Sequence, residues 1–398
     1  MVFRRMKIAL VHDYLKEYGG AERVLKTLAE IYPNAPIYTA FSVKGSTAEK
    51  EFKDKEIYES WLAPLLKIDN LYSPLRFLTP LVWRSFDLSE YDLVITSCSW
   101  YITRGFEVGP KTKVMAYCHT PPRWLYGYET SVGFTKYWPV KVYSVIVGHF
   151  MRMYDFKTAQ VPTKNKEQRT KNRKIRGGVN YFIANSKNVA DRIKKFYRRD
   201  STVIYPPVDV KNIIKSTGNP PSPRLRWTKE DYFLMVSRLV GAKGLEEAAK
   251  AFKNSKYKLK IVGEAHGFSD VEKRLKRLSG ENVELIGRVS VEELYTLYAN
   301  AKGFIALARD EDFGMTVVEA MAAGTPVIAF NGGGFKESVV DGITGVLIND
   351  TDETTLENAI ERFNKIKWDR KKLQENAKRF SKERFEMELK EVISSKIK

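Results

Sequence analysis

The sequence predicts an α/β protein with two domains, each built around a parallel sheet. Its length of 398 residues exceeds the roughly 100–200 residues that one domain usually holds. Short apolar runs alternate with helical or irregular segments, which is the pattern of βα units. This alternation stops near residues 206–223 and then begins again, which places the domain junction there.

The first half begins with an apolar run at 7–12 that is expected to be a buried strand. Gly19 and Gly20 follow it and lead into an amphipathic helix that runs to about Ile31. A glycine pair between a strand and a helix can bring backbone close to a phosphate. The spacing is not that of a dinucleotide-binding fingerprint. Further strands are expected at 37–41, 93–96, 114–117, 181–184 and 203–205.

The second half repeats the rhythm after a stretch, 216–223, whose three prolines and glycine make it the expected linker. The last 30 residues are expected to form a charged helix that reaches back to the first domain. We therefore expect an N-terminal domain at 1–205, a C-terminal domain at 206–379 and a returning helix at about 380–398. Strands of the second domain are expected at 232–236, 259–262, 283–286, 303–307 and 326–330.

Residues 305–330 contain the strongest candidate for a ligand site. An apolar run ends in three acids, and a Phe-Gly turn and a helix follow, so this loop lies where open α/β sheets bind ligands. Backbone N–H groups at 314–316 could meet an anion, and Glu311 and Glu319 could hold hydroxyl groups. Alternatively, both glutamates are solvated acids near a helix start. The neighbouring apolar strand and glycines favour the ligand site.

Two cations, Arg238 and Lys243, stand between a strand and a helix and suit a diphosphate. The alternative is a pair of ordinary surface cations. His119 follows the expected strand at 114–117, where a side chain can face a cleft. A structural histidine is the alternative there.

The positive charge gathers in the first half of the chain. Residues 1–215 carry 36 Lys and Arg against 20 Asp and Glu, and residues 151–200 carry 15 against 4. This asymmetry indicates an anionic partner: a membrane surface, nucleic acid or a phosphorylated substrate. The basic run at 163–174 is either a solvated flexible loop or a contact for anionic phospholipid or a phosphate-bearing acceptor.

Large apolar side chains crowd residues 61–86, which predicts either core-packed helices or a surface that meets lipid. No apolar stretch approaches the ~18–20 residues of a membrane span. The N-terminus does not resemble a secretory signal. Two cysteines argue against a disulfide framework or a metal cluster. We expect a cytoplasmic protein, peripheral on the inner face of the membrane.

Several motifs together resemble the retaining glycosyltransferases of family 4. The most specific are the Glu-x7-Glu pattern of Glu311 and Glu319 and the segment Ser-Arg-Leu-Val-Gly-Ala-Lys-Gly at 237–244. The segments at 19–24, 205–209 and 333–345 fit as well. The resemblance covers nearly the whole chain. It implies the GT-B fold, in which two Rossmann-like domains with parallel sheets face each other across a cleft.

The resemblance also implies roles for single residues. Catalytic roles fall to His119, Arg238, Lys243 and Glu311. Donor-binding roles fall to Gly19, Gly20, Arg238, Lys243, Val289, Glu311, Phe313, Gly314, Met315, Thr316 and Glu319.

Each implied role has a chemical reason. Arg238 and Lys243 would neutralise the donor diphosphate, and Gly20 would offer backbone to it. Glu319 would bind ribose, whereas Glu311 and the N–H groups of 313–316 would hold the transferred sugar. The backbone at Val289 would contact the base, and His119 would line the sugar site.

The implied reaction moves a hexose from a nucleotide sugar to a glycan or a lipid-linked acceptor with retention at the anomeric carbon. The residues around His119 resemble mannosyltransferases of O-antigen assembly, so GDP-mannose is the expected donor and UDP-glucose the alternative. No cofactor or metal is expected, because the two cations stand where a divalent ion otherwise would.

Asp312 replaces the glycine usual in the Glu-Gly-Phe-Gly pattern and adds a charge near the sugar. Nucleic-acid binding is a remote alternative, because the basic run contains no aromatic residue for base stacking.

Overall fold

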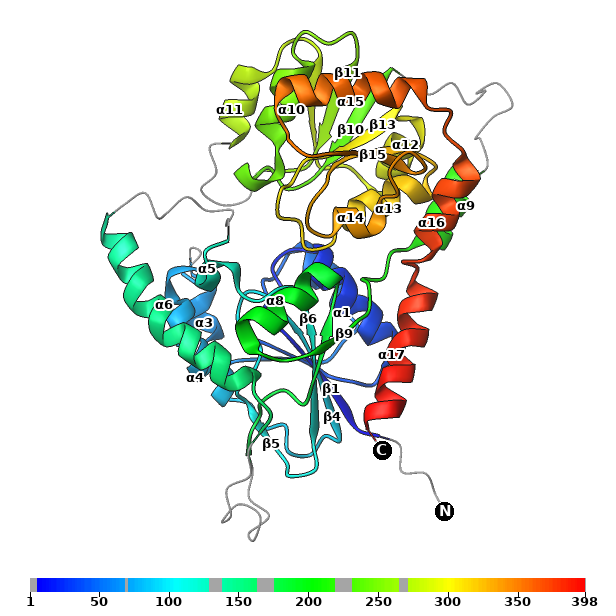
Figure 1. The fold of residues 1–398 in the computed structure, drawn as a ribbon. Helices are drawn as coiled ribbons and strands as arrows, with labels where there is room; N and C mark the ends of the chain where they lie inside the picture. The colour runs from blue at the N-terminus through cyan, green and yellow to red at the C-terminus, as the bar shows by residue number, and fades with distance from the viewer. Residues whose placement is uncertain are drawn as a thin grey trace. The chain divides into compact units, whose positions relative to one another are not determined.

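The computed structural model describes residues 6–68, 71–128, 138–162, 175–218, 231–264 and 271–397. The chain divides into two compact units (Figure 1). The described part of the first unit comprises 6–68, 71–128, 138–162, 175–205 and 386–397, and that of the second comprises 206–218, 231–264 and 271–385. The α/β class with two large parallel sheets is confirmed.

The first unit is built on a seven-stranded parallel sheet in the order β3-β2-β1-β4-β6-β8-β9. Its strands are β1 (Ile8–His12), β2 (Ile37–Thr39), β3 (Ile57–Glu59), β4 (Leu93–Cys98), β6 (Lys113–Cys118), β8 (Tyr181–Ala184) and β9 (Ser201–Val203). Its helices are α1 (Gly20–Ile31), α2 (Thr47–Phe52), α3 (Ala63–Leu66), η1 (Pro74–Leu78), α4 (Thr79–Arg84), α5 (Arg123–Tyr126), α6 (Trp138–Ala159) and α8 (Lys187–Tyr197).

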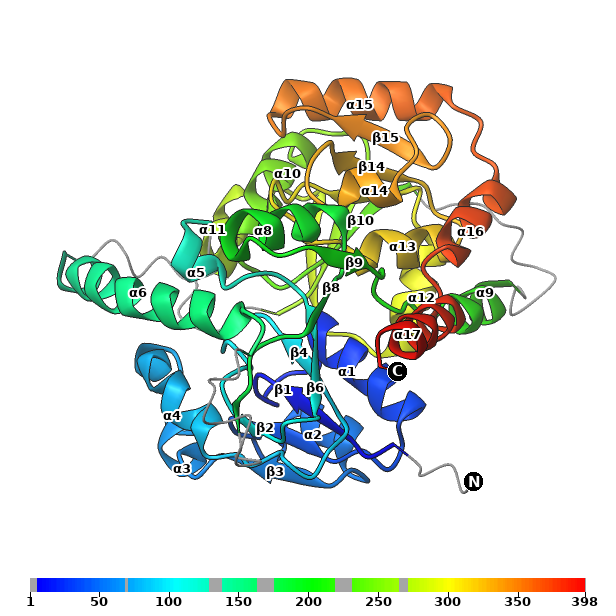
Figure 2. The ribbon, with the colours of Figure 1, turned by 60° about the horizontal axis from the view of Figure 1, so that its bottom comes forward.

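The order of the central strands determines which loops meet in this unit. Strands β1, β4 and β6 are consecutive neighbours in the sheet and are buried almost throughout. Parallel neighbours end at the same edge, so the residues that follow β1, β4 and β6 come together there. Helix α1 packs against β1 and β4 (Figure 2). A small antiparallel pair, β5 (Glu107–Val108) and β7 (Ile175–Arg176), lies outside the main sheet.

The second unit has a six-stranded parallel sheet in the order β12-β11-β10-β13-β14-β15. One group of helices, α10, α11 and α15, packs together, and a second group comprises α9, α12, α13 and α16. The strands are β10 (Tyr232–Val236), β11 (Lys258–Val262), β12 (Val283–Gly287), β13 (Gly303–Ala306), β14 (Val327–Phe330) and β15 (Gly345–Ile348). The helices are α9 (Val210–Gly218), η3 (Gly241–Lys243), α10 (Leu245–Phe252), α11 (Val271–Leu278), α12 (Val291–Asn300), α13 (Met315–Ala322), α14 (Phe335–Ser338), α15 (Glu353–Lys365), α16 (Arg370–Lys378) and α17 (Lys382–Lys396).

Two local expectations were wrong. Residues 216–218 are the last turn of α9 rather than linker, because Ile213 and Thr217 bury one face of that helix. The rest of the expected linker lies outside the described residues. The C-terminal segment forms two helices, α16 and α17, which are separated where Ser381 pairs with Val208. From Glu386 onward α17 belongs to the first unit, where Leu389 is buried.

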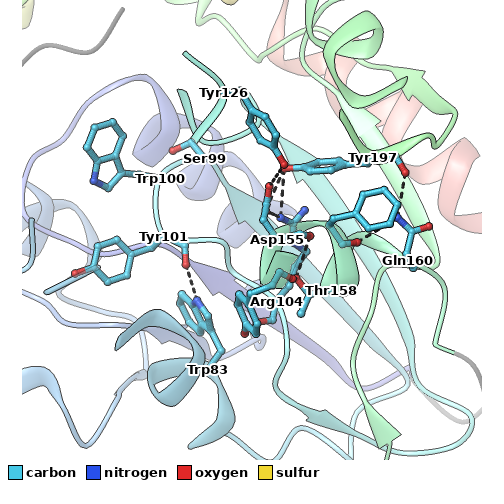
Figure 3. Close-up of polar contacts among 12 residues, drawn as sticks. Trp83, Ser99, Trp100, Tyr101, Arg104, Tyr126, Asp155, Thr158, Gln160 and Tyr197 are labelled. Atoms are coloured by element: carbon cyan, nitrogen blue, oxygen red, sulfur yellow. Dashed lines mark hydrogen bonds and ion pairs between the residues drawn. The ribbon is translucent and has the colours of Figure 1, made fainter. Parts of the chain in front are cut away.

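A buried ion pair fixes helix α6 to the body of the first unit (Figure 3). Arg104 contacts Asp155 of α6, and both side chains are almost completely buried. The hydroxyl of Tyr126 donates to Asp155 Oδ2 at 2.7 Å, and Tyr197 donates to Oδ1 at 3.3 Å. Burial raises the pKa of Asp155, whereas the charge of Arg104 opposes that rise. The Arg104–Asp155 pair therefore joins α6 to the buried interior of the first unit.

We predict that Asp155→Ala destabilises the first unit by about 3–5 kcal/mol, because it leaves the Arg104 guanidinium buried without its counter-charge. Urea unfolding followed by tryptophan fluorescence measures this, since five of the seven tryptophans lie within residues 1–205. The matched control is Asp341→Ala, which removes an exposed partner of Arg362 and should cost less than about 1 kcal/mol. Equal effects of the two substitutions would contradict this role of Asp155.

Candidate functional site

Two loops of the second unit meet at the carboxyl edge of its sheet. The loop after β10 ends in the single turn η3, which carries Lys243, and the loop after β13 carries Glu311. Lys243 Nζ lies 2.5 Å from Glu311 Oε2, and both side chains are partly exposed, at 26% and 18%. Strands β10 and β13 are neighbours in the sheet, so their following loops are adjacent. The structure thus joins two residues that lie 68 positions apart in the sequence.

A third loop, which follows β14 and carries Gly333 and Gly334, holds the backbone of Glu311. The N–H of Gly334 donates to the carbonyl of Glu311 at 2.9 Å. Gly333 has φ +53°, and a Cβ there would lie 2.2 Å from the same carbonyl oxygen. A Cβ at Gly334 would lie 2.3 Å from Cα of Phe313. Only glycine permits so close an approach, so the glycines at 333–334 position the acidic loop.

Helix α13 begins directly after that loop. Gly314 is its N-cap with φ +88°, and the half-buried Met315 and Thr316 form the first turn. Backbone N–H groups of a first helical turn lack partners within the helix and can bind an anion. Phe313 is buried, and its ring lies 5.3 Å from that of Phe380. The loop and the helix start are therefore anchored on the apolar side.

The remaining predicted residues of this unit differ in exposure. Glu319 lies inside α13 with 2% exposure and accepts a hydrogen bond from the hydroxyl of Tyr298 at 2.9 Å. Arg238 is exposed, in the loop between β10 and η3. Val289 is half-buried and precedes Ser290, the N-cap of α12. Asp312 is half-buried, and its backbone carbonyl lies against Gly334.

In the first unit His119 occupies the corresponding edge, directly after β6. Its backbone N–H donates to the carbonyl of Cys98 at 2.9 Å, and its ring lies edge-on to Tyr117 at 5.3 Å. His119 Nε2 lies 2.8 Å from Ser97 Oγ, and Ser97 Oγ lies 3.0 Å from Nδ1 of His12. Burial, followed by the neighbouring His12, lowers the pKa of His119 to about 3. The ring is therefore neutral at physiological pH.

The glycine pair lies at the start of α1. Gly19 is the N-cap, and its N–H donates to Glu22 Oε2 at 2.9 Å. Gly20 is the exposed first residue of the helix. The other carboxylate oxygen of Glu22 lies 3.3 Å from His12 Nε2. Burial alone would raise the pKa of Glu22, but its hydrogen bonds, first of all the one with the His12 ring, lower it.

Sequence reasoning missed His12, Ser97 and the side chain of Glu22 as members of this edge. His12 and Ser97 lie at the ends of β1 and β4. A Glu three residues after an N-cap glycine is the signal that could have drawn attention to Glu22. Asp13, also missed, is buried and accepts hydrogen bonds from the backbone N–H groups of Ser99 and Trp100.

Among the described residues, no three or more His, Cys, Asp or Glu side chains are grouped so that they could hold a metal ion. Cys98 and Cys118 are buried free thiols.

Comparisons with known proteins find a family match within the second unit. Residues 222–380 match the family Glycosyl transferases group 1. An uncharacterized glycosyltransferase of Methanocaldococcus jannaschii is 29% identical over 201 residues, which are 50% of this chain and 54% of that protein. The O-antigen chain mannosyltransferase RfbU of Salmonella typhimurium is 30% identical over 196 residues, 47% of this chain and 51% of RfbU. The chain thus spans about half the length of these relatives.

The fold of the whole chain is also shared with solved structures. Anabaena HepE, solved in complex with UDP and glucose, superimposes with a TM-score of 0.63 over 98% of this chain and 100% of HepE, at 19% identity. This likeness establishes the GT-B fold. The chain therefore has the GT-B fold, and its residues 222–380 carry the match to the family Glycosyl transferases group 1.

Proposed function

We propose that this protein is a retaining glycosyltransferase that transfers mannose from GDP-mannose to a glycan or a lipid-linked acceptor. The observation that carries the proposal is the contact between Lys243 and Glu311 beside the first turn of α13. An ammonium group and backbone N–H groups suit a diphosphate, and a carboxylate suits sugar hydroxyls. A nucleotide sugar offers both kinds of group to one site.

Arg238 and Lys243 supply positive charge for the leaving diphosphate. In the proposed reaction the bond between the anomeric carbon and the phosphate oxygen breaks, and a bond to the acceptor oxygen forms. The departing phosphate takes the acceptor's proton, so the protein need not provide a covalent nucleophile. Charge stabilisation by these cations and by the N–H groups of α13 would lower the barrier without a metal ion.

The choice of mannose is supported by the resemblance of the residues around His119 to mannosyltransferases and by one of the named relatives. RfbU is described as an O-antigen chain mannosyltransferase, and its likeness covers about half of each chain. HepE was solved with UDP and glucose, so UDP-glucose is the alternative donor. The base of the donor would lie near Val289, and its ribose near Glu319.

A membrane-bound acceptor is supported by the outer face of α6. Its large apolar side chains recur with helical spacing and are between 49% and 65% exposed at Val142, Val145, Ile146, Phe150 and Met153. Asp155 is the only acidic residue in 138–162, and it is buried. The helix therefore presents apolar and cationic groups to solvent, a combination that suits an anionic lipid surface.

Exposed apolar residues of the neighbouring 61–86 segment extend this face. Phe77 and Leu81 are 40% and 43% exposed, and the ring of Phe77 lies 6.4 Å from that of Tyr143 on α6. Other residues of the segment, among them Val82 and Trp83, are buried in the core. The expectation of core-packed helices in 61–86 is therefore confirmed in part, and contact of its exposed residues with lipid remains our proposal. The basic run at 163–174 lies outside the described residues. In the described ranges, none of the helices has the length and apolarity needed to cross a bilayer.

We predict that GDP-mannose raises the melting temperature in EDTA more than UDP-glucose does, because a ligand that binds the folded state stabilises it by mass action. Lys243→Ala should abolish this shift and lower kcat/KM for mannosyl transfer by about 10²–10³-fold. Lys250→Ala, which removes an exposed lysine of α10, is the matched control and should behave as wild type. A Lys243→Ala variant with full activity would refute the diphosphate assignment.

We also predict that the protein floats with vesicles that contain phosphatidylglycerol and less with phosphatidylcholine alone. The double variant Ile146→Ser, Phe150→Ser should lose most of this binding, because it removes the centre of the apolar face. The control is Val291→Ser, at a residue on α12 of the second unit that is 56% exposed. Equal, negligible binding to both vesicle types would favour a soluble acceptor.

A further inference from the structure

Four side chains of the first unit form a continuous hydrogen-bonded chain. Glu22 contacts His12, His12 contacts Ser97, and Ser97 contacts His119, at 3.3, 3.0 and 2.8 Å. They come from α1 and from the ends of β1, β4 and β6. His12 and Ser97 are each 1% exposed and His119 is 9% exposed, so water has little access to the links between them.

The donor and acceptor at each link follow from Glu22. A carboxylate only accepts hydrogen bonds, and Glu22 already accepts one from the N–H of Gly19. His12 must therefore donate with Nε2–H. In a neutral ring Nδ1 of His12 is then an acceptor, and Ser97 donates its hydroxyl proton to it. Ser97 Oγ in turn accepts a hydrogen bond from Nε2–H of His119.

The opposite direction would require a charged His12. If His12 carried protons on both nitrogens, Nδ1–H could donate to Ser97, and Ser97 could donate to His119. That arrangement places an imidazolium in a position with 1% exposure, although its link to the Glu22 carboxylate, at 3.3 Å, is longer than the roughly 2.7–2.9 Å of a charge-assisted hydrogen bond. A buried charge is costly unless its pairing is close. The neutral arrangement satisfies every link without that cost.

We infer that the chain Glu22–His12–Ser97 holds His119 in the Nε2–H tautomer, so that Nδ1 accepts a hydrogen bond from a hydroxyl of the transferred sugar. This inference rests on the proposed function and adds three positioning residues to it. His119 Nδ1 makes no hydrogen bond to any residue that the structure describes. The edge-on contact with Tyr117 also restrains the plane of the ring.

The carboxylate of Glu22 would therefore determine the tautomer of His119, although three hydrogen bonds separate the two side chains. Glu22→Gln keeps an oxygen that accepts from Gly19 N–H and turns an NH2 group toward His12 Nε2. An amide donor there reverses every link, because His12 Nε2 must then accept. His119 would present Nδ1–H, a donor, where the wild type presents an acceptor. Glutamine can also accept the hydrogen bond from the Gly19 N–H at the start of α1, so the fold should persist.

The direct test is nitrogen-15 NMR of the imidazole rings at pH 8. The chain has 4 histidines, which single substitutions assign. We expect His119 to show a protonated Nε2 and an unprotonated Nδ1 in the wild type and the reverse in Glu22→Gln. Thr96→Val removes a neighbouring buried hydroxyl that takes no part in the hydrogen bonds from Glu22 to His119, so it should leave the tautomer of His119 unchanged. A wild-type His119 with Nδ1–H, or a charged ring, overturns the inference.

A transfer assay then tests the consequence for activity. Glu22→Gln and Ser97→Ala should each lower kcat/KM by about tenfold or more, since each removes the oriented acceptor, whereas Thr96→Val should not. Full activity of Glu22→Gln with a reversed tautomer contradicts the sugar contact. If the wild type transfers no hexose from any nucleotide sugar, the proposed function fails, and the NMR result still decides whether the tautomer is fixed.

Discussion

The ion pair between Lys243 and Glu311 is the contact on which the candidate donor site depends. It ties the loop after β10 to the loop after β13, and the glycines at 333–334 hold the second of these loops from the other side. A diphosphate would compete with Glu311 for the ammonium group of Lys243.

Much of this arrangement could be predicted from the sequence. The strand Tyr232–Val236 and the helix Gly20–Ile31 lie where the apolar pattern and the glycine pair placed them. Strand β13, the acidic loop and α13 follow one another as expected for residues 305–330. These features depend on local pattern and capping, which a single sequence carries. The order of the strands in the sheets is not local and needed the structure.

The first unit shows why the remainder could not be predicted. His12, Ser97 and His119 are 85 and 22 residues apart along the chain, and only the order β1-β4-β6 brings them together. Some apolar residues of 61–86 are buried and others are exposed, because each short helix there has one face in the core and the other in solvent. Helix α9 overrode the linker signal because its buried face packs against α12 and α13.

Calorimetric titration of the protein with GDP and GMP in EDTA tests the central claim most directly. The account predicts that GDP binds at least about tenfold more tightly than GMP, because the second phosphate adds a contact with cations worth roughly 1.5–3 kcal/mol. Lys243→Ala should remove that difference and leave GMP binding unchanged. Equal affinity for both nucleotides in the wild type, or no binding of GDP or UDP, would contradict the account.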